Sequence, residues 1–263
     1  HRLHRVFEGH GLDPLLQQEV RLWLRATRPY LWRGLPARHR FEAQMHHFDW
    51  LVQRFSAPSV CAFYAAGRRT LLTLQRGEHT VSLHLQPAYG LAREGELELH
   101  LCLNGREVLR AALSVLPASC LDMAGGGQVL CVGSIQGNRD GKAQVQQLTA
   151  LMERTRPSGL LMQALQGLAQ AWEVAALIGV SDQGHVYAGY RGLAKRVGMS
   201  YDELWQELGA IERCNLTHWR LPMQWIPRDE SEVPSSKRAQ LRRRNALREQ
   251  MLQASRQEAL ALH

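Results

Sequence analysis

The stretch LELHLCLNG, residues 97–105, decides the fold class of this chain. Leucine occupies every second position from Leu97 to Leu103, which is the period of a half-buried β-strand. The Asn104-Gly105 pair that follows favours a tight hairpin turn, and residues 107–116 have the apolar character of a returning strand. The segment therefore predicts an antiparallel hairpin with one buried face.

The flanking sequence extends this hairpin into a larger sheet. Short strands are predicted at 70–74 and 80–85, with Arg76-Gly77 as the turn between them, and an apolar, central strand at 128–135. Helical patterns follow at 144–154 and 160–172, then a buried strand at 176–180 and a helix at 201–208. Ser200 and Glu203 are placed as the capping box of that last helix. An antiparallel meander followed by strand–helix–helix–strand predicts one mixed, largely antiparallel α/β or α+β sheet with packed helices.

The two ends of the chain are expected to be helical. Helical spacing of apolar residues covers 14–25 and 36–55, and Pro58 is expected to end this helical region. Three parts are thus predicted: a helical N-terminal region at 1–58, the mixed α/β core at 59–230 and a basic C-terminal helix at 231–263.

Composition excludes several classes of protein. The chain has 263 residues, of which 45% are hydrophobic, so a folded core is expected. No stretch approaches the ~20 apolar residues of a membrane span. The five cysteines are odd in number and form no C-x-x-C pair, which argues against a disulfide framework or a zinc site and favours the reducing cytoplasm. No histidine pair has metal-ligand spacing with carboxylates, so no metal is expected.

The net charge of +8 is concentrated at the C-terminal end. From Ser235 onward seven Lys or Arg and two Glu give 7 − 2 = +5, which leaves 8 − 5 = +3 for the rest. Such a segment could bind nucleic acid, an anionic membrane or an acidic protein, and a solvated helix face is the alternative. The residues expected to make these contacts are Lys237, Arg238, Arg242, Arg243 and Arg244.

The segment 129–142 carries the clearest chemical signal. A buried strand runs into a glycine-containing loop that opens a helix, where free backbone N–H groups can bind a phosphate or an oxyanion. Packing alone can also explain such a loop. If it is functional, the cofactor-binding residues are Gln136, Gly137, Asn138, Arg139, Gly141 and Lys142.

An ordered set of short motifs resembles the bacterial VirK/YbjX family over roughly residues 28–248. The motifs are Arg28-Pro29, His46-His47-Phe48, Ile135-Gln136-Gly137, Arg156-Pro157, Gly179-Val180-Ser181, His185-Val186-Tyr187, Tyr201 to Trp205, Glu207-Leu208-Gly209, Leu221-Pro222 and Pro234 to Arg238. Ala150, Ala210 and Ser236 depart from the family's pattern. The resemblance implies a role in bacterial virulence and stress response, and it brings no established catalytic mechanism.

The same order of elements also looks like the acyltransferase (GNAT-like) fold that binds acyl-coenzyme A. That fold's phosphate loop reads Gln/Arg-x-x-Gly-x-Gly/Ala; Gln136 and Gly141 fit it, whereas Arg139 stands at its middle glycine. The donor would be acyl-coenzyme A or an aminoacyl-tRNA, and the acceptor an amine of a small molecule or peptide.

Three residues are the catalytic candidates of such a transferase. His185 is expected to act as the base, because histidine titrates near neutral pH, and Tyr187 or Tyr201 would protonate the leaving group. The structural alternatives are that His185 caps a turn and that Tyr201 and Trp205 form a packed helix face. A non-catalytic binding protein that uses its basic helix remains the second hypothesis.

Overall fold

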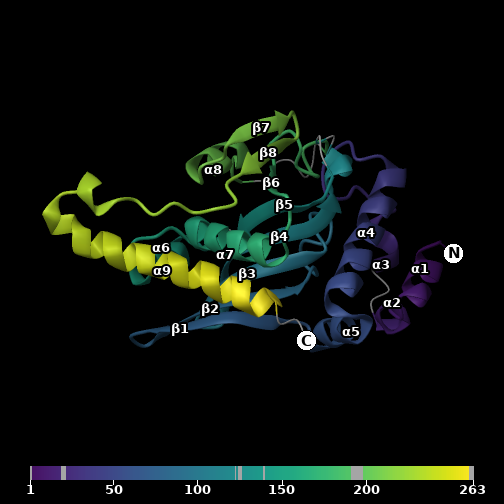
Figure 1. Cartoon of the computed structure of the whole chain (residues 1–263), viewed down its shortest axis with the longest axis horizontal. Helices are drawn as coiled ribbons and strands as arrows, with labels where there is room; N and C mark the ends of the chain where they lie inside the picture. The colour runs from purple at the N-terminus through teal and green to yellow at the C-terminus, as the bar shows by residue number, and fades with distance from the viewer. Residues whose placement is uncertain are drawn as a thin grey trace.

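Within residues 2–18, 22–121, 123, 126–138, 140–190 and 198–260, which the computed structural model describes, eight strands form one sheet (Figure 1). Their order is β1-β2-β3-β4-β5-β6-β8-β7. The strands are β1 (Arg69–Arg76), β2 (His79–Pro87), β3 (Leu97–Leu103), β4 (Arg106–Pro117), β5 (Gln128–Gly137), β6 (Ala176–Val180), β7 (Glu212–Asn215) and β8 (His218–Leu221).

One strand pair in this sheet is parallel. β5 and β6 run in the same direction and pair from Val129 to Val132 against Ala176 to Gly179, whereas every other neighbouring pair is antiparallel. The connection between them carries two helices, as a parallel connection requires. The prediction of a mixed, largely antiparallel sheet with packed helices is therefore confirmed.

Helices cover one face and one end of the sheet. The helices of the described residues are α1 (Arg2–Gly9), α2 (Asp13–Gln18), α3 (Leu22–Arg25), α4 (Ala37–Phe55), α5 (Ala57–Ala66), α6 (Lys142–Leu151), α7 (Pro157–Ala171), α8 (Tyr201–Glu207) and α9 (Ser235–Leu260). α9 packs along α7 over one face, and α4 contacts β4 at the far end (Figure 1). Leucines of β3 and β4 share one hydrophobic core with residues of α4, α7 and α9.

The sequence prediction of β3 as a half-buried strand was wrong. Glu98 and His100 are buried as well as the leucines, because the β2–β3 loop crosses their face of the sheet. The backbone N–H of Leu91 in that loop donates to Glu98 Oε1 at 2.6 Å. The Nε2 of His100 lies 2.6 Å from Glu98 Oε2. Local polar partners therefore allow two ionisable side chains to be buried where alternation indicates solvent.

Two further expectations need correction, and one is confirmed. Pro58 does not end the helical region, because it stands in the first turn of α5, where its missing N–H costs no helical hydrogen bond. The short strands β7 and β8 were not predicted, since they are polar and only four residues long. The cap at Ser200 is present: its side chain accepts from the backbone N–H of Glu203 at 3.2 Å.

A buried ion pair fixes the β2–β3 loop. The guanidinium of Arg25, at the end of α3, pairs with Glu96 and also donates to the carbonyl of Ala88 at 2.6 Å. The hydroxyl of Tyr30 donates to the other oxygen of Glu96. All three side chains are buried, so the N-terminal helices and the loop are joined by a fully desolvated polar cluster.

Arg25→Met is expected to destabilise the protein by about 3–5 kcal/mol, because it leaves the carboxylate of Glu96 buried without its cation. The double variant Arg25→Met with Glu96→Met should recover much of this loss, since no unpaired charge remains. Urea unfolding of the three proteins measures both effects. A single variant that costs less than about 1 kcal/mol would contradict a structural role for this pair.

Candidate functional site

A cavity of about 690 Å³ lies at the carboxyl end of β5, between the β2–β3 loop and the start of α8. This is the end of the parallel strand pair, the place where ligands bind in open α/β sheets. The lining residues come from four segments and are Gly90, Leu91, Arg93, Glu94, Arg110, Ile135, Gln136, Gly137, Asn138, Tyr187, Gly198, Met199 and Tyr201.

The backbone of Glu94 is in close contact with the backbone of β5 at Gly133. The pairing of β4 with β5 shifts register between Ala112 and Leu113, which leaves Gly133 as the extra residue of a β-bulge. A Cβ atom at Gly133 would overlap the backbone carbonyl of Glu94. Glycine at the bulge thus permits the close approach that brings the Glu94 side chain to the cavity.

The carboxyl group of Glu94 is buried and only half satisfied. Its Oε1 accepts from the side-chain amide of Gln136 at 2.9 Å, whereas Oε2 has no hydrogen-bond partner among the described residues. Burial raises the pKa of Glu94 to about 7, despite the opposing effects of the Gln136 hydrogen bond and the charge of Arg110. A carboxyl group that exchanges its proton near neutral pH has the property required of a general acid or base.

Glu94 is a candidate functional residue that sequence reasoning missed. It stands among three closely spaced glutamates, Glu94, Glu96 and Glu98, directly before the hydrophobic strand β3. Such spacing is typical of a solvated loop, and nothing in it indicates burial. The neighbouring Gly95, which allows the loop to pass close to the backbone of Leu113, was the local signal available.

Two arginines line the same cavity. The guanidinium of Arg93 lies over the ring of Tyr187, 5.8 Å from its centroid. The Nε of Arg110 is 3.6 Å from Glu107 Oε1, and its guanidinium also packs against the backbone of Gly90. The cavity therefore has two cationic side chains beside one carboxyl group that is partly protonated at neutral pH.

The predicted cofactor loop is divided between the cavity and the surface. Gln136, Gly137 and Asn138 line the cavity. Gly141 is the N-cap residue of α6, and no side-chain hydrogen bond caps the first turn of that helix. Lys142 is exposed in the same turn. Arg139 lies outside the described residues.

The predicted catalytic residues lie close together, although only the tyrosines reach the cavity. Tyr187 and Tyr201 line it, and the hydroxyl of Tyr201 donates to the carbonyl of Ile135 at 3.1 Å. His185 stacks on the Tyr201 ring, with centroids 5.0 Å apart and planes at 13°. It is buried behind that ring, and desolvation lowers its pKa to about 4.

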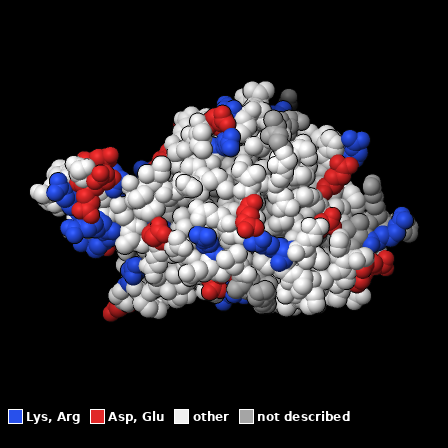
Figure 2. Space-filling view, viewed as in Figure 1, with Lys and Arg blue, Asp and Glu red and all other residues white. Residues whose placement is uncertain are grey.

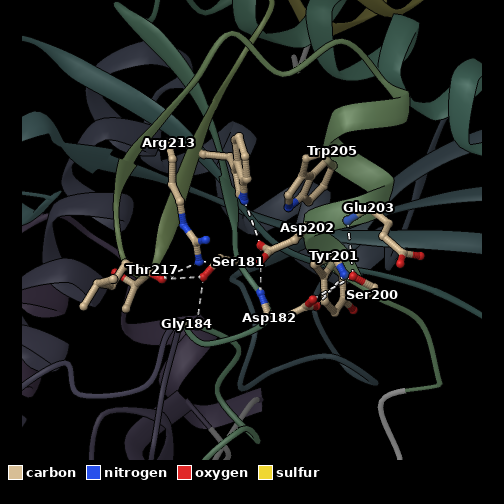
Figure 3. Close-up of polar contacts among 12 residues, drawn as sticks. Ser181, Asp182, Gly184, Ser200, Tyr201, Asp202, Glu203, Trp205, Arg213 and Thr217 are labelled. Atoms are coloured by element: carbon tan, nitrogen blue, oxygen red, sulfur yellow. Dashed lines mark hydrogen bonds and ion pairs between the residues drawn. The ribbon is translucent and has the colours of Figure 1, made fainter.

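A hydrogen-bonded network positions Tyr201 at the start of α8 (Figure 3). Asp182 Oδ1 accepts from the backbone N–H of Tyr201 at 2.5 Å, and Oδ2 accepts from the Ser200 hydroxyl at 2.7 Å. Asp202 in turn accepts from the indole N–H of Trp219 at 2.7 Å. These contacts tie α8 to the segment after β6 and fix the tyrosine that closes one side of the cavity.

The C-terminal basic run does not line the cavity, and acidic residues accompany it at the start of α9. Figure 2 shows Lys and Arg side by side with Asp and Glu at the end of the molecule where α9 begins. Arg242 lies 3.5 Å from Glu230 and Arg243 lies 3.1 Å from Glu153, whose backbone carbonyl also accepts from Arg244. Lys237 and Arg238 are exposed.

Two further features bear on the predicted ligands. No helix of the described residues combines the length and apolar character needed to cross a membrane. In the same residues, no group of three His, Cys, Asp or Glu side chains is arranged to hold a metal ion.

The Glu94 carboxyl predicts a specific pH dependence of stability. Its folded pKa lies above its ordinary value of 4.5, so its contribution is greatest below pH 4.5 and is lost as the pH rises through about 7. Relative to Glu94→Gln, the wild-type protein should lose roughly 2 to 3 kcal/mol of unfolding free energy between pH 5 and pH 8.

The comparison with Glu94→Gln is necessary because buried histidines act in the opposite direction. His47, His185 and His218 have lowered pKa values and favour the folded state as the pH rises. Urea unfolding of both proteins at several pH values measures the difference. Parallel pH profiles for the two proteins would show that Glu94 titrates normally.

Comparison with known proteins assigns the chain to a family. Residues 2–257 match the model of a family described as "Protein of unknown function (DUF535)". The chain is 27% identical to the uncharacterized protein YbjX of Escherichia coli (strain K12) over 240 residues, 89% of this chain and 71% of that protein. An uncharacterized protein of Haemophilus influenzae is 31% identical over 125 residues, 46% of this chain and 41% of that protein. No solved structure matches. The chain belongs to the DUF535 family, and its predicted relationship to YbjX is confirmed.

Proposed function

We propose that this protein is an acyltransferase that moves an acyl group from a thioester donor to an amine, with Glu94 as the general base. The observation that carries the proposal is the carboxyl group of Glu94, which is buried at a cavity, has an unpartnered oxygen and has a pKa of about 7. A base of this kind accepts a proton at neutral pH without the cost of reorganising water.

The arrangement around β5 supports acyl-coenzyme A as the donor. Antiparallel strands lead into a single parallel pair, and a glycine-containing loop follows β5 directly and opens α6. This is the order of elements expected of an acyltransferase-like (GNAT-like) scaffold. The uncapped first turn of α6 and the exposed Lys142 offer backbone N–H groups and a charge for the donor's phosphates. An aminoacyl-tRNA is the alternative donor.

The proposed reaction needs one proton acceptor and one proton donor. Glu94 Oε2 takes a proton from the amine as its nitrogen attacks the thioester carbonyl carbon. The new C–N bond forms, the C–S bond breaks, and the thiolate takes a proton from the hydroxyl of Tyr187. The proton on Glu94 then returns to the tyrosinate through solvent. Tyr201 positions the site, because its hydroxyl is already held by Ile135.

The proposal assigns the base to Glu94 in place of His185. A histidine with a pKa of about 4 is a weak base at neutral pH, and its burial behind Tyr201 separates it from the cavity. In this scheme His185 supports the Tyr201 ring by stacking. The role in bacterial stress or virulence is carried forward from the family resemblance as part of the proposal, and the cytoplasmic location is carried forward from the cysteine content.

Glu94→Gln is expected to lower kcat for amine-dependent thiol release from acetyl-coenzyme A by about 10²–10⁴-fold. Donor binding should be unchanged, because the substitution preserves the size and the hydrogen-bonding capacity of the side chain. In the wild type, kcat/KM should increase with pH, reach half of its maximum at about pH 7 and level off above it, as Glu94 loses its proton. Thiol release and isothermal titration with coenzyme A measure the two quantities.

His185→Gln is the matched control, since it alters a neighbouring titratable group outside the cavity wall. Equal losses of kcat in the two variants would contradict the assignment of the base to Glu94. If coenzyme A does not bind, whereas tRNA binds and this binding is lost when Lys237, Arg238, Arg242, Arg243 and Arg244 are replaced by Gln, the non-catalytic binding hypothesis replaces the transferase.

A further inference from the structure

The charges that line the cavity restrict what it can bind. Its ionisable side chains are Arg93, Arg110, Glu94 and two tyrosines. Because the carboxyl of Glu94 has a pKa of about 7, it carries only part of a negative charge at neutral pH. The cavity is therefore cationic. Its charge disfavours a ligand that is only positively charged and favours a ligand that carries negative charge.

The two guanidinium groups differ in how far they are already engaged. Arg110 is shared with Glu107, at 3.6 Å, and its side chain is 27% exposed. Arg93 rests on the ring of Tyr187 and has no carboxylate within ion-pair distance in the described part of the chain. A guanidinium that rests on an aromatic ring keeps its N–H edge available for an oxyanion.

Glu94 gives the ligand a direction. Gln136 holds its Oε1, so that Oε2 is the atom left for a ligand's donor group. An amine is the donor that a partly ionised carboxyl group binds best, because it can share or transfer a proton there. A single cavity thus has one place for an amine and two cations for an oxyanion.

We propose that the acceptor substrate is an amine that also carries an oxyanion, a phosphate or a carboxylate, bound by Arg93 and Arg110 while the amine faces Glu94. This inference rests on the proposed function, because the molecule is an acceptor only if acyl transfer occurs. Its binding to the cavity does not require transfer. A phosphate dianion matches the two cations in charge, and a carboxylate matches either guanidinium in geometry.

The test is a binding measurement on the full chain without a donor. Phosphoethanolamine is compared with ethanolamine, and β-alanine with propylamine, so that each pair differs in its oxyanion. At least one oxyanion ligand should bind about tenfold or more tightly than the amine of the same pair that lacks the oxyanion. The ligand pair that shows this difference identifies phosphate or carboxylate as the group recognised. Equal affinities within both pairs would overturn the inference.

Substitutions then locate the bound oxyanion. Arg93→Gln and Arg110→Gln should each remove about tenfold or more of the preference, and Arg110→Lys should restore part of it by keeping the charge. Arg248→Gln is the matched control, because Arg248 also lies over an aromatic ring, that of Trp225, outside the cavity. Equal losses in Arg93→Gln and Arg248→Gln would overturn the assignment of the oxyanion to this cavity.

Glu94→Gln separates this inference from the proposed function. The variant should retain the oxyanion preference, because it keeps both arginines, and should lose acyl transfer. If the preference and its dependence on the arginines are observed but acetyl-coenzyme A is never consumed, the ligand class holds and the transferase fails. If transfer occurs equally to amines with and without an oxyanion, the transferase holds and the ligand class fails.

Discussion

The ion pair between Arg25 and Glu96 ties the β2–β3 loop to the N-terminal helices, and the candidate site depends on that loop. The loop contributes Gly90, Leu91, Arg93 and Glu94 to the cavity wall. Burial of two charges is costly unless the geometry and the remaining hydrogen bonds are satisfied, and here Tyr30 and the carbonyl of Ala88 supply those bonds. A polar cluster of this kind adds less to stability than to the definition of one loop conformation. Its position beside the cavity accords with that role.

Three glutamates in five residues experience three different environments. Glu96 has a guanidinium and a phenol as partners, and Glu98 has His100 together with a backbone N–H. Burial acts to raise the pKa of Glu98, but these partners outweigh it and lower that pKa. Glu94 has the amide of Gln136 as its side-chain hydrogen-bond partner, and this bond together with the charge of Arg110 is too weak to offset desolvation. Hydrogen-bonding partners therefore lower the pKa of Glu98, whereas burial raises the pKa of Glu94 and also that of Glu96 despite its two partners.

The sequence predicts those features that local periodicity controls. Leucine alternation in β3, the Asn104-Gly105 turn and the Ser200 cap each depend on neighbouring residues, and each has its structural counterpart. Gln136 was identified because it lies where a buried strand runs into a glycine-containing loop. Glu94 was missed because its burial depends on Gly133 and Arg25, which are 39 and 69 positions away in the chain. Such long-range contacts leave no periodic pattern in a single sequence.

The number of basic residues in a segment also fails to predict where positive charge is available in the folded chain. The C-terminal helix has the highest density of basic residues, yet Glu230 and Glu153 pair with two of its arginines. Arg93 stands in a segment with no basic excess, since Glu94, Glu96 and Glu98 follow it directly. In the folded chain, however, Glu96 and Glu98 are engaged with other groups, and Glu94 is partly protonated. The positive charge available to a ligand depends on the charges left unpaired after folding. By this criterion the cavity is a candidate site for anions as much as the basic helix is.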